Sequence, residues 1–531
     1  MPRGGWLHFE AMRNNQLLLI LSQFNTKEMK SPYYFKSIAL SVTIFLFFSQ
    51  ICQAQLTISA QIRARGEYRA GYGSLVPKDL IAGNNDTSAA GFISQRTRLN
   101  FLYKFEKIAM GLAIQDVRVW GQDASTISSA DGSKLGVHEA WAEAILSDSL
   151  GLSVKFGRQE LLYDDSRLLG NLDWLQQARR HDAAVFKLNK MGWQVDLGLA
   201  FNQTTDAVNT YNTFYTAGNT PAYITVKGTA VTIPSGFVPT ASLGGAPVLA
   251  SNVSTNGANQ MYKTMQYLYA SKTVGKTKIS ALFFKDDFEK FRTDSLSSGT
   301  EKVYGRRYDV AGSNSRVTFG AMAVGTAKKF SYSVGAYFQT GTDRDGKDLT
   351  AYNIFGYVGY TAGKMTVGLG YELLSGNDPN TVATENHRFD PLYGTPHKFW
   401  GYMDYWYAGA GSPVAGLSNP YLKLKYAATP KFSIALDVHN FSIANDFANK
   451  VSDGTGSTLL DKNMGYETDL VFNYAMSKSA IFELGYCTMF GNNSLEVVKM
   501  NTIGKAEQTA TWAYLMVTIK PELFKTEMPK K

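Results

Sequence analysis

The sequence of 531 residues has few cysteines, few prolines and few charged side chains. Its two cysteines exclude a disulfide scaffold and a cysteine-rich metal site. Charged residues make up 18% of the chain, below the ~25% that is typical of soluble domains. The net charge of +9 is modest for this length and is spread along the chain, so we expect no nucleic-acid partner.

Aromatic residues and glycine are abundant, with 30 Tyr, 31 Phe and 48 Gly. The apolar fraction of 44% is too high for a disordered chain. The one conspicuous apolar run, residues 38–48, is too short to cross a membrane as a helix, which needs ~20 residues. This composition favours many strands, each with one polar face.

The apolar run at residues 38–48 follows two lysines and precedes a small residue, Ala54. A basic segment, a short apolar segment and a small residue at the end are typical of a secretory signal peptide. We therefore expect residues 1–54 to be a signal peptide with an extended N-terminus, cleaved between Ala54 and Gln55. Residues 55–531 are then expected to form a single domain.

From Leu56 to Arg69 the chain alternates between apolar and polar side chains. Successive side chains of a strand point to opposite faces, so Leu56 and Ile62 belong to an apolar face and Arg63 belongs to a charged face. The segment is fourteen residues long. Globular strands average ~5–6 residues, whereas a membrane-spanning strand needs ~9–11.

The same alternation recurs along the chain. We predict eighteen strands, near residues 56–69, 94–105, 108–120, 137–146, 152–158, 181–188, 193–201, 263–271, 277–285, 316–325, 329–340, 352–361, 365–374, 418–427, 431–441, 466–475, 479–489 and 509–519. The connections between them alternate between short and long. The predicted fold is all-β, a transmembrane antiparallel β-barrel of about eighteen strands with short periplasmic turns and long extracellular loops.

Several motifs resemble the alginate-export porin family. They are Gln115-Asp116-Val117-Arg118-Val119-Trp120-Gly121; Gly157-Arg158-Gln159 with Tyr163, Asp165, Arg167-Leu168-Leu169-Gly170, Asp173-Trp174 and Arg180-x-Asp182; Tyr371-Glu372-Leu373-Leu374-Ser375-Gly376-Asn377-Asp378; Phe389-Asp390-Pro391-Leu392-Tyr393-Gly394-Thr395-Pro396-His397; and Gly401-Tyr402-x-Asp404. The resemblance covers essentially the whole chain after the signal peptide.

This resemblance implies an eighteen-stranded monomeric barrel in the Gram-negative outer membrane, with a basic pore for an anionic polysaccharide. The expected partners are outer-membrane lipid and an anionic saccharide or small anionic solute. The driving force is expected to be the solute gradient or a periplasmic export partner. No cofactor is expected.

Charged residues on the predicted inner faces are candidates for lining the pore or contacting the solute, because rings of Arg and Lys favour anions. Strand alternation or the family motifs select Arg63, Arg65, Arg69, Arg96, Arg98, Arg118, Arg158, Arg167, Arg179, Arg180, Lys423, Lys425, Glu467 and Asp469. The alternative is that these residues neutralise one another between neighbouring strands. Residues 159–180 are too apolar for a free loop, and we expect them to fold into the lumen as a constriction.

Motifs for chemistry are weak. None of the six histidines has HExxH spacing, and the sequence has no GxSxG elbow or P-loop, so we expect no enzyme. Asp343, Asp345 and Asp348 surround Gly346 as carboxylates do in calcium loops, but the remaining ligands are missing and a solvated turn is favoured.

Three functions remain open. The first is a passive channel for an anionic saccharide or small anion. The second is a general or nutrient-specific diffusion porin without strong anion preference. The third is an occluded barrel whose long loops, 202–262 and 375–417, bind a partner.

Overall fold

The computed structural model describes residues 54–78, 89–121, 135–203, 222–226, 228–234, 236–245, 247–248, 262–298, 301–407, 411–449, 451 and 459–526. The expected signal peptide lies almost entirely outside these residues and stays a prediction. Residues Leu56–Thr526 form one compact unit, and the fold below is that of this unit. No helix in the described part of the chain is long and apolar enough to cross a membrane.

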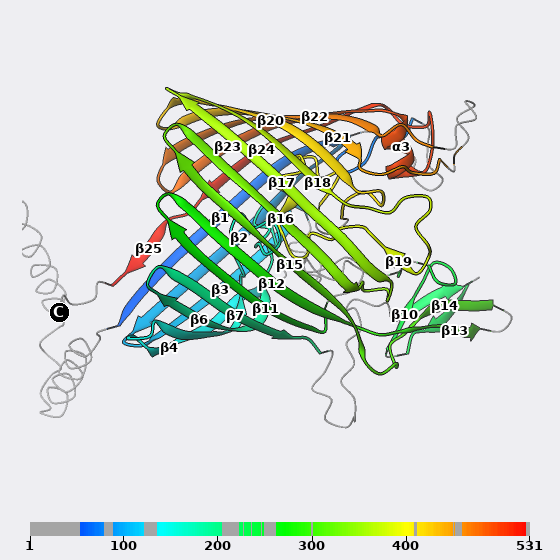
Figure 1. The fold of residues 1–531 in the computed structure, drawn as a ribbon, viewed down its shortest axis with the longest axis horizontal. Helices are drawn as coiled ribbons and strands as arrows, with labels where there is room; N and C mark the ends of the chain where they lie inside the picture. Colours follow the sequence, from blue (N-terminus) through cyan, green and yellow to red (C-terminus); the bar gives the residue numbers. More distant parts are fainter. Residues whose placement is uncertain are drawn as a thin grey trace, which may run out of the picture. The chain divides into compact units, whose positions relative to one another are not determined.

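Eighteen strands pair with their neighbours and close into a barrel (Figure 1). They are β1 (Gln55–Ala70), β2 (Ala90–Phe105), β3 (Ile108–Val119), β4 (Gly136–Ser147), β5 (Leu152–Gln159), β6 (His181–Lys190), β7 (Trp193–Phe201), β11 (Thr264–Val274), β12 (Thr277–Glu289), β15 (Ser313–Ala327), β16 (Phe330–Thr342), β17 (Asp348–Ala362), β18 (Met365–Leu374), β20 (Leu417–Thr429), β21 (Phe432–Ile443), β22 (Asn463–Ser477), β23 (Ala480–Gly491) and β24 (Thr509–Ile519). The antiparallel pairing of β1 with β24 closes the ring. The predicted eighteen-stranded barrel is therefore confirmed.

Each strand has one outer and one inner face, as the alternation predicts. In β1, Ile62 and Tyr68 are about half exposed, whereas Arg63 and Arg65 are buried. Apolar side chains cover the outer face because lipid offers polar groups no hydrogen bonds. The inner face carries the polar and charged residues that the site uses.

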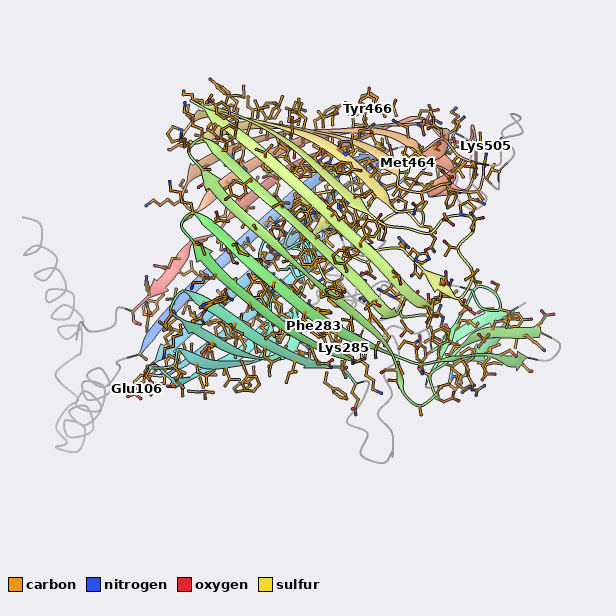
Figure 2. The ribbon with its side chains drawn as sticks, viewed as in Figure 1. Glu106, Phe283, Lys285, Met464, Tyr466 and Lys505 are labelled. Carbon is orange, nitrogen blue, oxygen red and sulfur yellow. The ribbon has the colours of Figure 1, made fainter. Side chains whose placement is uncertain are left out.

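Short turns lie at one end of the barrel and long loops at the other. Glu106, in a two-residue turn, and Lys505, in a long loop, lie at opposite ends (Figure 2). The short strand β25 (Glu522–Lys525) pairs with the start of β1. The backbone N–H of Thr526 also donates to the carbonyl of Leu56, at 2.9 Å. Both ends of this unit therefore lie at the end with the short turns.

The long loops carry structure that the sequence pattern did not predict. A hairpin joins β8 (Tyr223–Val226) and β9 (Thr229–Thr232), and a second sheet contains β10 (Phe237–Pro239), β13 (Arg292–Ser298) and β14 (Glu301–Arg307). The remaining elements are β19 (Glu385–Asn386), the 3-10 helix η1 (Pro396–Lys398) and the α-helix α3 (Asn493–Met500). All of these elements follow the long-loop ends of barrel strands.

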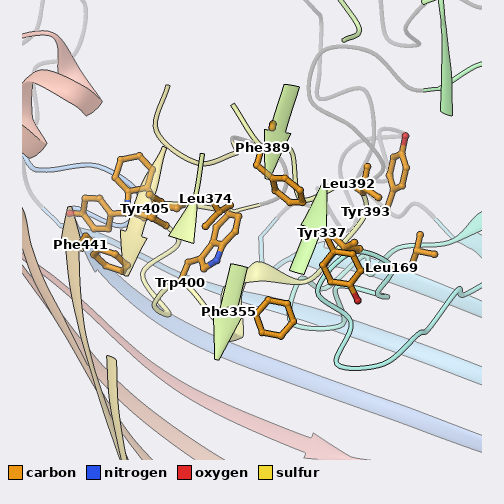
Figure 3. Close-up of a cluster of buried hydrophobic side chains, with 14 of the residues drawn as sticks. Leu169, Tyr337, Phe355, Leu374, Phe389, Leu392, Tyr393, Trp400, Tyr405 and Phe441 are labelled. Carbon is orange, nitrogen blue, oxygen red and sulfur yellow. The ribbon is translucent and has the colours of Figure 1, made fainter. Parts of the chain in front are cut away.

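Two long loops fold into the barrel rather than away from it. Their buried side chains, including Leu169, Tyr393 and Trp400, pack with inner-face residues such as Tyr337 and Phe355 (Figure 3). The hydrophobic core of this barrel therefore lies inside it, between the loops and the inner wall. We call residues 160–180 the inner loop and residues 375–416 the second loop.

Candidate functional site: the arginine wall and the inner loop

Four arginines on two neighbouring strands form a basic area of the inner surface, which we call the arginine wall: Arg63, Arg65, Arg96 and Arg98. They share one face because their positions differ by two within each strand. All four are at most 8% exposed. Burying four guanidinium groups is costly unless each is paired or hydrogen-bonded, so their partners decide what the wall does.

The inner loop supplies those partners. The carboxylate of Asp173 lies 2.8 Å from the Arg96 guanidinium and 3.4 Å from that of Arg63. Although burial opposes it, these arginines hold the pKa of Asp173 below its ordinary value. The Asp173 side chain keeps 43% of its surface exposed, so an accessible carboxylate is bound by two buried arginines.

Further contacts fix the inner loop along the wall. The Arg63 side chain donates to the carbonyls of Trp174 and Leu175, at 3.2 and 3.1 Å, and to the Gln176 side chain, at 3.0 Å. The guanidinium of Arg65 lies 4.2 Å from the centre of the Trp174 ring and donates to its carbonyl. The inner loop is thus attached by charge and by hydrogen bonds, most of them to its backbone.

Arg98 lies at the edge of this network. It donates twice to the side-chain carbonyl of Gln115, whose amide donates in turn to the Gln177 carbonyl at 2.9 Å. The carboxylate of Glu160, at the start of the inner loop, lies 3.7 Å from the Arg98 guanidinium and accepts a hydrogen bond from Nε2 of His138, at 2.8 Å. The wall therefore contacts the inner loop near both of its ends.

The inner loop also contacts the second loop. The N–H of Gly170 donates to the carbonyl of Tyr393 at 3.0 Å, and Arg179 donates to the carbonyl of Gly394. A Cβ atom at Gly394 would lie 1.8 Å from the carbonyl oxygen of Arg167, so only glycine allows this approach. The two loops therefore form one packed body inside the barrel.

Arg167 joins this body to the barrel strands β17 and β18. Its guanidinium is paired with Glu372 of β18 and lies between the rings of Phe355 and Phe399, 3.8 and 3.9 Å from their centres. Ring faces are favourable for a guanidinium because their electron density is negative. These contacts of Arg167 attach the two packed loops to the inner face of β17 and β18.

The acidic candidates bind the second loop. Glu467 accepts from the backbone N–H of Met403 at 2.8 Å, and Asp469 accepts from that of Tyr402 at 3.2 Å. Both carboxylates are fully buried on β22. Lys423 is paired with Asp437 on the neighbouring strand, whereas Lys425 is exposed near the short-turn end.

Arg118 and Arg158 require a correction, because neither lies on the inner face. Arg118 follows the parity of the exposed Met110 and pairs with Asp116 at 2.6 Å. Arg158 pairs with Asp182 at 2.8 Å, and both side chains are at least 40% exposed. These pairs lie at the long-loop ends of their strands, where opposite charges offset each other on the outer face.

The remaining basic candidates are Arg69 and Arg180. Arg69 pairs with Glu67 at 2.7 Å and lies over the ring of Tyr72, and Arg180 is half-buried at the end of the inner loop.

The calcium candidates do not form a site. Asp343 accepts backbone N–H groups of its own turn and Asp345 pairs with Arg306. Within the described residues, no three His, Cys, Asp or Glu side chains are placed to hold a metal ion.

A second inner ion-pair network was missed at the level of the sequence. Arg316 of β15 pairs with Asp286 of β12 at 2.6 Å, and Asp390 of the second loop binds Arg316 and Arg344 at 2.8 and 2.6 Å. Arg316 begins the predicted strand 316–325, whereas Asp286 lies one residue past the predicted strand 277–285. Extending that strand by one residue was the available signal for this pair.

The family model described as "Alginate export" matches residues 54–226 and 242–496. No curated protein matches the chain.

Among solved structures, the chain is similar to the outer-membrane protein OpdK from Pseudomonas aeruginosa, with 10% identity over 88% of this chain and 98% of that chain and a TM-score of 0.49. It is also similar to OpdQ from the same organism, with 12% identity over 89% and 98% of the two chains and a TM-score of 0.46. Since the family model covers most of the sequence, the chain belongs to the alginate export family and is a porin-like barrel of the Gram-negative outer membrane.

Proposed function

We propose that this barrel is a passive channel for an anionic saccharide or another small anionic solute, and that it performs no catalysis. The observation that carries the proposal is the position of Asp173. Its half-exposed carboxylate is bound by Arg63 and Arg96, which are themselves buried. The inner surface therefore already binds one carboxylate at a place that solvent reaches, and a solute carboxylate has the same chemistry.

The arginine wall supports selectivity as well as binding. Its guanidinium groups are held by hydrogen bonds to the inner loop, so an anion that enters is attracted to a preformed positive area. Family membership supports transport as the general role. Lipid around the outer face and a monomeric state belong to the same proposal.

Single-channel recording in a planar bilayer under a KCl gradient tests the proposal. We expect anion-biased conductance from the unmodified chain. Asp173→Asn removes the negative charge that offsets Arg63 and Arg96 and should raise the chloride-to-potassium permeability ratio about twofold or more. Arg96→Gln should lower that ratio, and a glucuronate oligomer should block the current.

Arg158→Gln is the matched control, because Arg158 lies on the outer face and pairs with Asp182. This variant should leave the selectivity unchanged. Conductance without anion bias, and without an effect of Asp173→Asn, would favour a general diffusion porin and refute the anion-selective channel.

A second candidate function rests on the packing of the two loops. Their contacts fill part of the interior with buried side chains, including Leu169, Leu392 and Trp400. This packing favours a barrel that is closed at rest and whose loops bind a partner at the outer surface. This candidate predicts that well-folded barrels conduct no ions. It also predicts that conductance appears when residues 164–178 are replaced by a short glycine-serine linker.

A further inference from the structure

Lysine is concentrated in the short turns of the barrel, at the end where Figure 2 labels Glu106. Five consecutive short turns, from the β6–β7 turn to the β20–β21 turn, each carry a lysine in the turn or at its edge and contain no acidic residue. We call these six side chains the lysine arc: Lys190, Lys276, Lys328, Lys329, Lys364 and Lys431. The next short turn, between β22 and β23, adds Lys478. This end of the barrel therefore carries an uninterrupted row of positive charge.

The charges of the lysine arc are exposed and are not offset by carboxylates. All six side chains are exposed, and among the described residues none of them forms an ion pair. Lys107, in a turn outside the arc, does pair with Asp148 at 3.4 Å. Consecutive short turns are separated by two strands, which is ~10 Å, and this distance is about one Debye length at 0.1 M salt. The potentials of neighbouring lysines therefore add, and an anion between two turns is attracted by both.

The lysine arc lies directly beside aromatic side chains of the lipid-facing surface. Trp193 is paired with Lys190 across the β6–β7 turn, and Phe330 follows Lys329 in the sequence. Both rings are 47% exposed on the outer face of the barrel. Aromatic side chains at the ends of membrane strands lie at the level of the lipid headgroups. The ammonium groups next to them therefore reach the same level, because a lysine has a long and flexible stem.

Apolar side chains at the tips of the same turns favour a lipid partner over a soluble one. Met191, beside Lys190, is 85% exposed, and Val274, near Lys276, is 59% exposed. A soluble acidic partner would satisfy the ammonium groups but would gain nothing from these apolar tips. A lipid surface satisfies both, since its phosphates attract the lysines and its acyl boundary takes up the apolar side chains.

We propose that the lysine arc binds anionic phospholipid in the periplasmic leaflet of the outer membrane, with headgroup phosphates between lysines of neighbouring turns. The five turns contain no arginine. Arginine builds fixed bidentate sites for phosphate, whereas the lysine ammonium acts as a mobile point charge. The arc therefore holds a layer of exchanging anionic lipids at the rim of the barrel. This contact is independent of the solute that the channel carries.

Native mass spectrometry of the full chain, in detergent micelles that contain equal amounts of phosphatidylglycerol and phosphatidylcholine, tests this assignment. Both lipids carry a phosphate, but in phosphatidylcholine the choline cation neutralises it. One lysine near an anionic lipid surface favours binding about fivefold. We therefore expect the unmodified chain to retain at least about three times as many phosphatidylglycerol as phosphatidylcholine molecules.

Removing charge from the lysine arc should bring this ratio close to one. The variant combines Lys328→Gln, Lys329→Gln, Lys364→Gln and Lys431→Gln. The matched control removes the same charge from exposed lysines of the long loops: Lys78→Gln, Lys302→Gln, Lys462→Gln and Lys505→Gln. It should keep the ratio of the unmodified chain. The heat-dependent gel shift shows that each chain is folded. If the fourfold variant does not fold, Lys328→Gln with Lys329→Gln should still lower the ratio.

A free phosphate ester separates lipid binding from binding of soluble phosphate. Glycerol 3-phosphate carries the phosphate without acyl chains, and at millimolar concentration it should displace no phosphatidylglycerol. Displacement would overturn the assignment to lipid. Equal retention of the two lipids by the unmodified chain would also overturn it and would favour a soluble acidic partner. A ratio that falls as far in the control as in the variant would overturn the lysine arc as the site.

Discussion

At the scale of single residues, Gly401 shows how closely the second loop approaches the barrel wall. Its φ of +82° lies in the left-handed region, and a Cβ atom there would be 2.5 Å from the Glu467 carboxylate. That carboxylate accepts the N–H of Met403. The loop therefore reaches its acceptor only because residue 401 has no side chain.

Gly401→Ala should destabilise the folded chain by about 1–3 kcal/mol, from backbone strain and from displacement of Glu467. The melting temperature in detergent, followed by the heat-dependent gel shift of the barrel, measures the loss. Gly356→Ala is the control, since its Cβ would meet nothing within 4 Å. Equal melting of all three chains would show that the loop tolerates the displacement.

The ion pairs of Asp390 should make the stability of the folded chain depend on pH. Burial raises the pKa of this carboxyl, but Arg316, Arg344 and the N–H of Leu392 outweigh burial and lower it to about 2. A carboxyl with a depressed pKa stabilises the fold at neutral pH, and this contribution disappears as the pH falls from about 4 to about 2. The contribution amounts to about 2 kcal/mol.

Asp390→Asn should therefore melt at a lower temperature than the unmodified chain at pH 7 and pH 5. The difference in melting temperature between the two chains should narrow below pH ~4, because protonation then removes the same charge from the unmodified chain. Asp148→Asn is the control, because Asp148 forms only an exposed pair with Lys107 and such pairs contribute little. A gap that stays constant down to pH ~2 would contradict this role of the Asp390 charge.

At the scale of elements, the barrel strands were predictable from sequence because lipid enforces alternation on every one of them. β13 was not, since Arg292-Thr293-Asp294-Ser295 is polar on both faces and shows no period of two. α3 has eight residues and too few turns for a clear helical period. Arg118 and Arg158 were misplaced for a different reason, because the family motifs rather than alternation selected them. Each shares the parity of an exposed apolar residue of its strand, Met110 or Phe156, so alternation alone places both on the outer face.

We expect the sheet of β10, β13 and β14 to fold independently of the barrel strands. Its backbone hydrogen bonds run within the sheet, and Arg306 forms an ion pair with Asp345 outside it. The β12–β15 pairing of the barrel is complete without the sheet. Replacing residues 292–307 with a short linker should leave the barrel melting temperature within about 2 °C. It should also increase proteolysis near Phe237, which β14 now covers. A barrel that fails to fold would show instead that the hairpin takes part in barrel assembly.

At the scale of the whole molecule, the sequence pattern predicted that the residues of the arginine wall lie on the inner face. It did not predict that the inner loop covers them. Arg63 and Asp173 are 110 positions apart, and nothing local links them. The contact exists because strand closure and the inner loop bring them together. The polar side of each strand was thus predictable, whereas its partners depended on how two long loops fill the interior.

Closure of the barrel between its first and last spanning strands is the property on which this arrangement depends. Ala64 of β1 lies opposite Val517 of β24 across that seam. Opposed residues in an antiparallel pair have Cα atoms ~4.5–5.5 Å apart, within the range that a disulfide spans. Ala64→Cys with Val517→Cys, in a background in which the native free cysteine Cys487 is serine, should therefore form a disulfide in the folded chain under mild oxidation.

The product is identified by its mobility on a non-reducing gel and by mass spectrometry of the linked peptides. Ala64→Cys with Ile481→Cys is the control, because Ile481 lies on β23 and β24 separates it from β1. Strands are spaced ~4.8 Å apart, so two spacings exceed the reach of a disulfide and the control pair should stay reduced. Because the seam unites strands from the two ends of the chain, its disulfide should also slow unfolding. Failure of the Ala64–Val517 pair to link, with both cysteines reactive in the folded protein, would mean that the barrel is open at this seam and that the arginine wall borders a gap.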